Sequence, residues 1–126
     1  MLYLLLIQYD PTQSQAVDDP PTLQPQHAAL EREMRAEGIF VSGAALMPPE
    51  FAARVRVQQG VPTDGPFAET KELLGGYYIV ECADAPEAAK QAARIPVGGN
   101  GWIEIRPIVL FHADVEHISK MLIVNP

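Results

Sequence analysis

The sequence is short of cysteine and of basic side chains, and each shortage excludes a class of protein. The single cysteine, Cys82, cannot form an internal disulfide, and its place in the apolar run YYIVECA is typical of a buried, unreactive thiol. Only nine lysines and arginines stand against 16 acidic residues, which gives a net charge of −7. This balance argues against a nucleic-acid-binding surface, which needs clustered bases, and against attraction to anionic membranes.

Long apolar runs are missing as well. No run approaches the roughly 20 residues of a membrane-spanning helix. The opening stretch is apolar only from Leu2 to Ile7, with no basic residues before it and no small-residue cleavage site after it, so it does not fit a signal peptide. We therefore expect a cytoplasmic protein. Its 126 residues, 48% hydrophobic and 20% charged, are typical of one globular domain.

Apolar periodicity and turn residues predict alternating strands and helices. Residues 10–25 contain four prolines and predict a long loop. The helix expected after this loop ends at Gly38, and its inner stripe is formed by Ala28, Leu30, Met34 and Ala36. The predicted strands are 2–9, 39–46, 54–58, 61–64, 74–83 and 102–108, and the predicted helices are 26–38 and 85–96.

This order predicts an α+β fold, a ferredoxin-like βαββαβ arrangement with an inserted hairpin at 54–64. Both helices would cover one face of the sheet. An apolar open face needs a partner, so we expect a homodimer that packs sheet to sheet. The domain spans residues 1–108. The extension 109–126 is too apolar for a free tail, and it covers a sheet edge, adds a strand or reaches across a dimer.

The chain resembles the YCII-related family, and within it the DGPF branch, in the strings LYLLLIQYD, EMRAEGIFVSGAAL, RVRV, TDGPFAETKELLGGYYIVECAD, EAAKQAARIP and IEIRPI. The resemblance covers residues 1–108 and implies a dimeric α/β barrel made from two ferredoxin-like protomers. It also implies a protein that in bacteria is often linked to extracytoplasmic-function sigma factors. It implies no particular activity. The proline-rich stretch 10–25 and the long tail depart from the family pattern and bear on substrate access and dimer geometry.

His27, in QPQHAAL, is the leading candidate for chemistry. Similar Pro-x-His stretches occur in the wider YCII-related family, where a histidine at this place and a nearby acidic residue are proposed as an active-site pair. A histidine titrates near neutrality and serves as general acid or base, and a position at the start of a helix would lower its pKa. The alternative is a partly exposed histidine without a partner.

Asp64 is the carboxylate expected near His27, because the loop after the first strand and the connection between the second and third core strands lie at the same end of the sheet. It would hold the imidazole tautomer, as the third member of a triad does. Alternatively, Asp64 opens the Asp-Gly-Pro turn by accepting a backbone N–H bond. Glu37 is a second candidate partner, but ten residues of helix span about 15 Å, which argues against a direct bond.

Residues around the DGPF segment are candidates for ligand binding. Lys71 and Arg54 are candidate anchors for a substrate carboxylate, which arginine can bind with two hydrogen bonds. Their structural alternatives are a solvated charged face for Lys71 and pairing with acids on neighbouring strands for Arg54. Phe67 anchors the turn in the core or contacts a partner. The tail segment HADVEH does not bring two histidines and a carboxylate together as a strand or a helix, so we expect no metal site, and no cofactor motif is present.

Two functions fit these residues. The first is a small cofactor-independent enzyme that carries out proton transfer, isomerisation or elimination on a carboxylated or phenolic molecule, with His27 and Asp64 as its pair. The second is a non-catalytic ligand-sensing or protein-interaction module linked to an extracytoplasmic-function sigma factor. An enclosed His27 with a carboxylate in bonding reach would favour the enzyme, and an exposed Phe67 over a filled core would favour the module.

Overall fold

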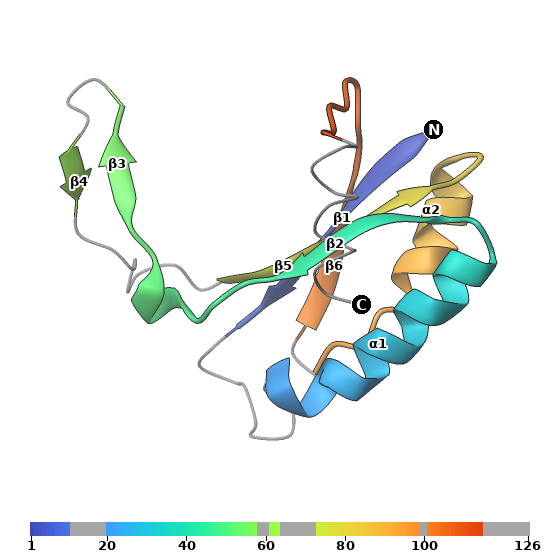
Figure 1. Cartoon of the computed structure of the whole chain (residues 1–126), viewed down its shortest axis with the longest axis horizontal. Coiled ribbons are helices and arrows are strands. Elements are labelled where there is room, and N and C mark those ends of the chain that lie inside the picture. The colour runs from blue at the N-terminus through green and yellow to red at the C-terminus, as the bar shows by residue number, and fades with distance from the viewer. Residues whose placement is uncertain (11–19, 58–60, 64–72, 99–100, 115–126) are drawn as a thin grey trace.

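The computed structural model describes residues 1–10, 20–57, 61–63, 73–98 and 101–114 (Figure 1). Within these residues the chain forms an α+β fold. The elements in chain order are β1 (Leu2–Tyr9), α1 (Pro20–Ala36), β2 (Phe40–Ala45), a short 3-10 helix (Pro49–Phe51), β3 (Arg54–Arg56), β4 (Val61–Thr63), β5 (Leu73–Glu81), α2 (Ala85–Ala92) and β6 (Gly101–Pro107).

The main sheet has the strand order β2-β5-β1-β6, and every neighbouring pair is antiparallel. Both helices lie on the same face of this sheet (Figure 1). This arrangement confirms the predicted α+β architecture and is consistent with the ferredoxin-like plan, in which β1-α1-β2 and β5-α2-β6 are the two βαβ halves. The predicted hairpin is formed by β3 and β4, which make a separate two-stranded sheet. Residues 58–60, which connect its two strands, and residues 64–72 lie outside the described residues.

The start of α1 differs from the expectation. Residues 10–25 were predicted as loop because of their prolines, but α1 begins at Pro20 and contains Pro25. Proline is tolerated in the first turn, where the backbone N–H has no intrahelical partner. Pro20 and Pro21 therefore fit the helix start, and Pro25 costs one backbone hydrogen bond. The end of the helix is as predicted: Gly38 has φ +76°, and the Ile39 N–H donates to the Met34 carbonyl (3.0 Å), which closes a Schellman turn.

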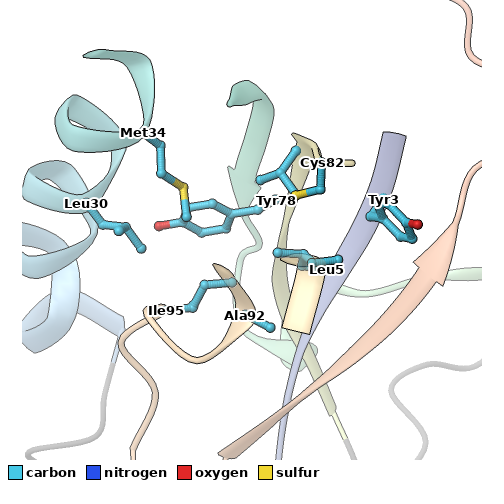
Figure 2. Packing of buried hydrophobic residues seen from close by; sticks show 10 residues of the cluster. Tyr3, Leu5, Leu30, Met34, Tyr78, Cys82, Ala92 and Ile95 are labelled. Atoms are coloured by element: carbon cyan, nitrogen blue, oxygen red, sulfur yellow. The ribbon is translucent and has the colours of Figure 1, made fainter. Parts of the chain in front are cut away.

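The core lies between the helices and the sheet (Figure 2). Its buried side chains are Tyr3, Leu5, Leu30, Met34, Tyr78, Val80, Cys82, Ala88, Ala92 and Ile95. Two members of the predicted α1 stripe, Leu30 and Met34, are buried, but Ala28 and Ala36 are exposed. His27 and Glu31 are half-buried instead, because the spacing 27, 30, 31, 34 follows one helix face.

Cys82 behaves as the sequence predicted. Its side chain belongs to the core, and burial together with the acidic neighbours Glu87 and Glu81 raises the pKa of its thiol. A raised pKa keeps the sulfur protonated and therefore unreactive at neutral pH. In the part of the chain that is described, no helix is long and apolar enough to cross a membrane.

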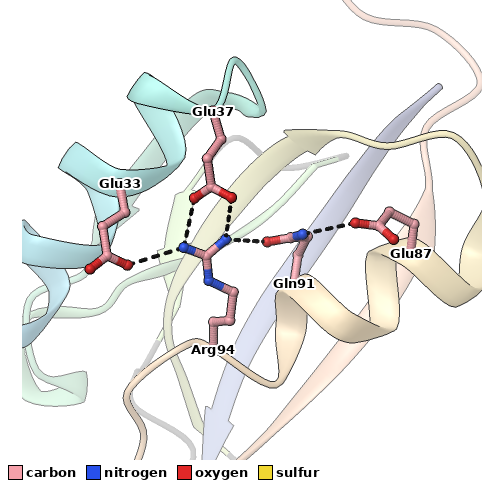
Figure 3. A network of polar contacts seen from close by, with 5 residues as sticks. All are labelled: Glu33, Glu37, Glu87, Gln91 and Arg94. Atoms are coloured by element: carbon pink, nitrogen blue, oxygen red, sulfur yellow. Dashed lines mark hydrogen bonds and ion pairs between the residues drawn. The ribbon is translucent and has the colours of Figure 1, made fainter.

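A polar network joins the two helices at their C-terminal ends (Figure 3). Arg94, just after α2, donates to both carboxylate oxygens of Glu37, at 3.1 and 2.7 Å, and to Glu33 on α1 at 3.1 Å. It also donates to Gln91 Oε1 (2.8 Å), and Gln91 in turn donates to Glu87 (3.0 Å). A two-pronged arginine–carboxylate contact fixes geometry as well as charge, so Arg94 holds the two helices in register.

We expect Leu5→Ala to lower the free energy of unfolding by about 2–5 kcal/mol, because Leu5 is fully buried in the central strand and its truncation leaves a cavity. Leu110→Ala is the matched control, since Leu110 is 71% exposed and should change stability by less than about 0.5 kcal/mol. Urea denaturation measures both, and equal losses would contradict the assignment of the core.

We expect Arg94→Ala to destabilise the fold by about 1 kcal/mol more than Lys90→Ala. Arg94 joins two helices, whereas Lys90 lies 4.0 Å from Glu87 on its own helix and is mostly exposed. Urea denaturation in low salt gives the difference, which should shrink in about 1 M NaCl because partly exposed charges are screened. A difference that is absent in low salt would show that the network does not stabilise the helix pair.

Candidate functional site

His27 lies on the inner stripe of α1 and faces the central strand β5. Its Nδ1 atom is 2.7 Å from the hydroxyl oxygen of Tyr78, and the two ring centroids are 5.9 Å apart. The Tyr78 ring is buried, with its hydroxyl directed toward the α1 side chains Leu30 and Met34 (Figure 2). The candidate site is therefore a histidine–phenol pair at the junction of helix and sheet, formed by residues far apart in the sequence.

Burial sets the charge state of this pair. Desolvation lowers the pKa of His27, an effect partly offset by a hydrogen bond to the backbone of Pro96. Since proline has no N–H, the Pro96 carbonyl accepts this bond from the ring. Desolvation, with a smaller contribution from the Glu31 carboxylate, raises the pKa of Tyr78 to about 12. At neutral pH the pair is thus a neutral imidazole beside a protonated phenol.

The lowered pKa of His27 has the predicted direction but a different cause. The sequence analysis placed His27 at the start of a helix, where the helix dipole would act on it. Because α1 begins at Pro20, His27 lies about two turns inside the helix, and the dipole effect falls off within the first turn. Loss of hydration at the helix–sheet junction is the cause instead.

This geometry permits proton transfer. A hydroxyl both donates and accepts, so Tyr78 can donate to a bare Nδ1 or accept from Nδ1–H. The first tautomer keeps the ring's N–H for the Pro96 carbonyl, whereas the second gives up that bond. In the second tautomer Nε2 is bare and is a proton acceptor. Tyr78 then occupies the position that a carboxylate takes in a triad, but it carries no charge.

Charged and aromatic groups surround the pair. Glu31, one turn after His27, accepts a hydrogen bond from Arg35 Nε (3.1 Å). The Arg35 guanidinium lies 4.6 Å from the centroid of the Phe40 ring, and Phe40 meets the Tyr78 ring edge to face at 6.2 Å. The Phe40 contact restrains the Tyr78 ring, and Arg35 is held by Glu31 and Phe40. The Arg35 cation is therefore committed to structural contacts.

The other residues singled out in the sequence do not join this pair within the described residues. Asp64, Phe67 and Lys71 lie outside them. Arg54 is exposed on β3, and Figure 1 shows the β3–β4 hairpin well separated from α1. Both oxygens of Glu37 bond Arg94, in agreement with the argument that helix length keeps it from His27. His112 and Asp114 are exposed, and among the described side chains no three potential metal ligands of the His, Cys, Asp and Glu types gather.

Sequence reasoning missed Tyr78, although a signal for it was present. Alternation along the strand places Tyr77 and Tyr78 on opposite faces of the sheet, so one of them has to lie against the helices. A buried tyrosine hydroxyl usually finds a hydrogen-bond partner. Combined with His27 on the 27, 30, 31, 34 stripe, these two rules would have named the pair.

We expect His27 to make the fold less stable in mild acid. Its pKa is lowered in the folded state from a value of 6.5, so below pH 6.5 the unfolded chain binds a proton that the folded chain does not. The stabilisation from the neutral imidazole is complete above pH 6.5 and is lost as the pH falls toward the folded pKa, by at most about 1.4 kcal/mol per pH unit.

The measurement is urea denaturation of the native protein and of His27→Gln at about pH 7.5 and about pH 5.5. Carboxylates contribute to the pH dependence of both proteins, so the informative quantity is the difference between them. The native protein should lose more stability than the variant. Identical losses would mean that the folded protein does not disfavour the charged imidazole.

Comparison with known proteins places the chain in a family. The family model described as "YCII-related domain" matches residues 1–112. The chain is also similar to an uncharacterised protein of Rhizobium meliloti (strain 1021), with 32% identity over 117 residues that cover 88% of this chain and 94% of the relative. Together with the α+β fold and its antiparallel sheet, these matches show that the chain belongs to the YCII-related family.

Proposed function

We propose that the protein is a small cofactor-independent enzyme that moves a proton on a carboxylated or phenolic small molecule, with His27 as its base. The contact between His27 Nδ1 and the Tyr78 hydroxyl, at 2.7 Å, carries this proposal. It gives the imidazole a fixed orientation through a partner that is itself held in the core. A neutral, oriented imidazole is the form that accepts a proton from a substrate.

Tyr78 acts as the positioning residue in this scheme. In the resting state the single N–H of the neutral ring donates to the Pro96 carbonyl, and Tyr78 donates to Nδ1. For catalysis the ring gives up the Pro96 bond and Nδ1–H donates to the Tyr78 oxygen instead. Nε2 then takes the substrate proton and the ring becomes an imidazolium. A neutral phenol stabilises that cation less than a carboxylate would. Such a base suits substrates whose proton is already acidic, for example a C–H bond next to a carbonyl group, or a phenol.

In this proposal Asp64 is a second carboxylate near the imidazole. Lys71 and Arg54 bind the anionic group of the substrate. The described groups next to His27 are neutral or acidic: Tyr78, the Pro96 carbonyl and Glu31. A carboxylate substrate therefore needs a cation from elsewhere. Residues 64–72 can supply Lys71, and the hairpin of a second copy can supply Arg54.

We also propose that two copies pack through the outer face of the main sheet and form a dimeric α/β barrel. Tyr3 and Leu5 face the helices, so Leu4 and Leu6 lie on the opposite face. Their cross-strand partners on β5 are Ile79 and Tyr77, which continues an apolar patch over the two central strands. A patch of this kind on an open sheet face is a typical association surface.

Proton transfer can be tested without knowing the product. The protein is incubated in D₂O with small 2-oxo acids, 3-oxo acids and hydroxybenzoates, and NMR follows the exchange of their C–H protons. We expect exchange of at least one compound to be accelerated, and His27→Ala to reduce this acceleration by about 10²-fold or more. Tyr78→Phe should give a smaller loss and shift the pH profile, because the imidazole keeps its place but loses the hydroxyl.

His112→Ala is the control for the histidine substitution, since His112 is exposed near the end of the described chain. It should leave exchange unchanged. Acceleration that persists in a folded His27→Ala protein would overturn the role of His27, whatever the identity of the substrate.

A further inference from the structure

The β3–β4 hairpin stands clear of the other elements that the structure describes. Figure 1 shows it at one end of the long axis, with none of the other labelled elements beside it. It is very small: β3 and β4 pair at only three positions, Arg54 with Thr63, Val55 with Pro62 and Arg56 with Val61. Pro62 has no N–H to donate to the ladder. A lone two-stranded hairpin is at best marginally stable in water, so this one needs a surface to pack against.

Apolar side chains are concentrated on this hairpin and on the segment that leads to it. We call residues 46–57 together with 61–63 the arm. Phe51 is 65% exposed and Val57 is 92% exposed. Among the described side chains of the arm, five large apolar ones are exposed: Leu46, Met47, Phe51, Val55 and Val57. Single exposed apolar residues are ordinary, but such a concentration marks an association surface.

Strand β3 is basic, whereas the chain that carries it is acidic. Arg54 and Arg56 are the two charged residues of β3, and the whole chain has a net charge of −7. The body of any copy of this protein is therefore acidic. Opposite charges on β3 and on the body favour the encounter of one copy's arm with another copy's body.

We propose that the arm packs on a second copy of this chain, each copy covering the arm of the other. A second copy is always present at the same concentration as the first. In a closed dimer with two-fold symmetry each arm contacts the other copy, so both arms are covered at once. The inference rests on the dimer proposed above and assigns the arm to its interface. It is independent of the chemistry of His27.

Sedimentation velocity tests this assignment. The native protein should sediment as a dimer, and the arm variant Phe51→Ser/Val57→Ser should raise the dimer dissociation constant at least tenfold. Lys90→Ser is the control, because Lys90 is mostly exposed on α2, away from both the arm and the outer face of the sheet, and it should change the constant by less than twofold. Arg56→Glu should also weaken the dimer, and its effect should diminish at high salt.

Circular dichroism shows whether each variant is folded. Photo-crosslinking is a second test, and it detects the contact between arm and partner directly rather than through its loss. A photo-crosslinker is attached at Val57→Cys in a Cys82→Ala background, and labelled and unlabelled chains are mixed. We expect crosslinks between chains. Crosslinks confined to one chain, or a dimer unaffected by the arm variant, would overturn the arm assignment alone. A monomeric native protein would overturn both the arm assignment and the dimer.

Discussion

The contact between α1 and β5 is the interaction on which the rest of the structure depends. A phenol hydroxyl in a core costs free energy unless it is hydrogen-bonded, and Tyr78 sits in the core at the middle of the sheet. His27 supplies its partner at 2.7 Å. The same face of α1 places Leu30 and Met34 in the core, so one helix face provides both the apolar contact and the polar tie. The position of α1 on the sheet is set by both.

The register of β5 follows from the same constraint. Successive side chains of a strand alternate between faces, so a slip of one residue would bury Tyr77 and expose Tyr78. The chain has a local irregularity at the other end of this strand, where Gly76 pairs with Ile7 and Leu74 with Gln8, leaving Gly75 as an extra residue. Glycine is needed beside it: a Cβ at Gly76 would lie 2.5 Å from the Ala44 carbonyl oxygen. The close approach of β2 to β5 therefore depends on that residue.

The architecture was predictable from the sequence because the spacing of apolar residues and the positions of glycine and proline indicate the same elements along most of the chain. A short apolar run predicted β1, aromatic and β-branched residues predicted β5, and alternation predicted β6. Gly38 marked the end of α1. The start of α1 was not predictable by the same rules, since prolines in a first helical turn look like a loop when only their number is considered. That error moved His27 to the helix terminus and led to the wrong cause for its lowered pKa.

Only one of the two residues of the candidate site was predicted from the sequence. His27 came from the resemblance to the YCII-related family, whereas Tyr78 is separated from it by 51 positions in the chain and carries no local motif. Its role emerges only when the helix stripe and the strand register are combined, which is tertiary information. The expected carboxylate partners do not replace it among the described residues, because Glu37 is bonded by Arg94 and Asp64 lies outside them.

The position of the arm between β2 and β5 indicates that it is an insertion into an otherwise complete fold. Ala45 at the end of β2 pairs with Gly76 of β5, and the Leu46 N–H donates to the Gly75 carbonyl at 2.9 Å. A short turn would join these two strands, as it does in ordinary hairpins. The chain instead leaves the sheet at residue 46 and returns at residue 73. The entropic cost of closing such a long connection is only slightly larger than that of a short one. Ordering a hairpin within the connection has a further entropic cost, which the hairpin's own three residue pairs do not offset. In the proposed dimer, contacts with the second copy supply that stabilisation, and the sheet core provides the rigid base from which the arm reaches it.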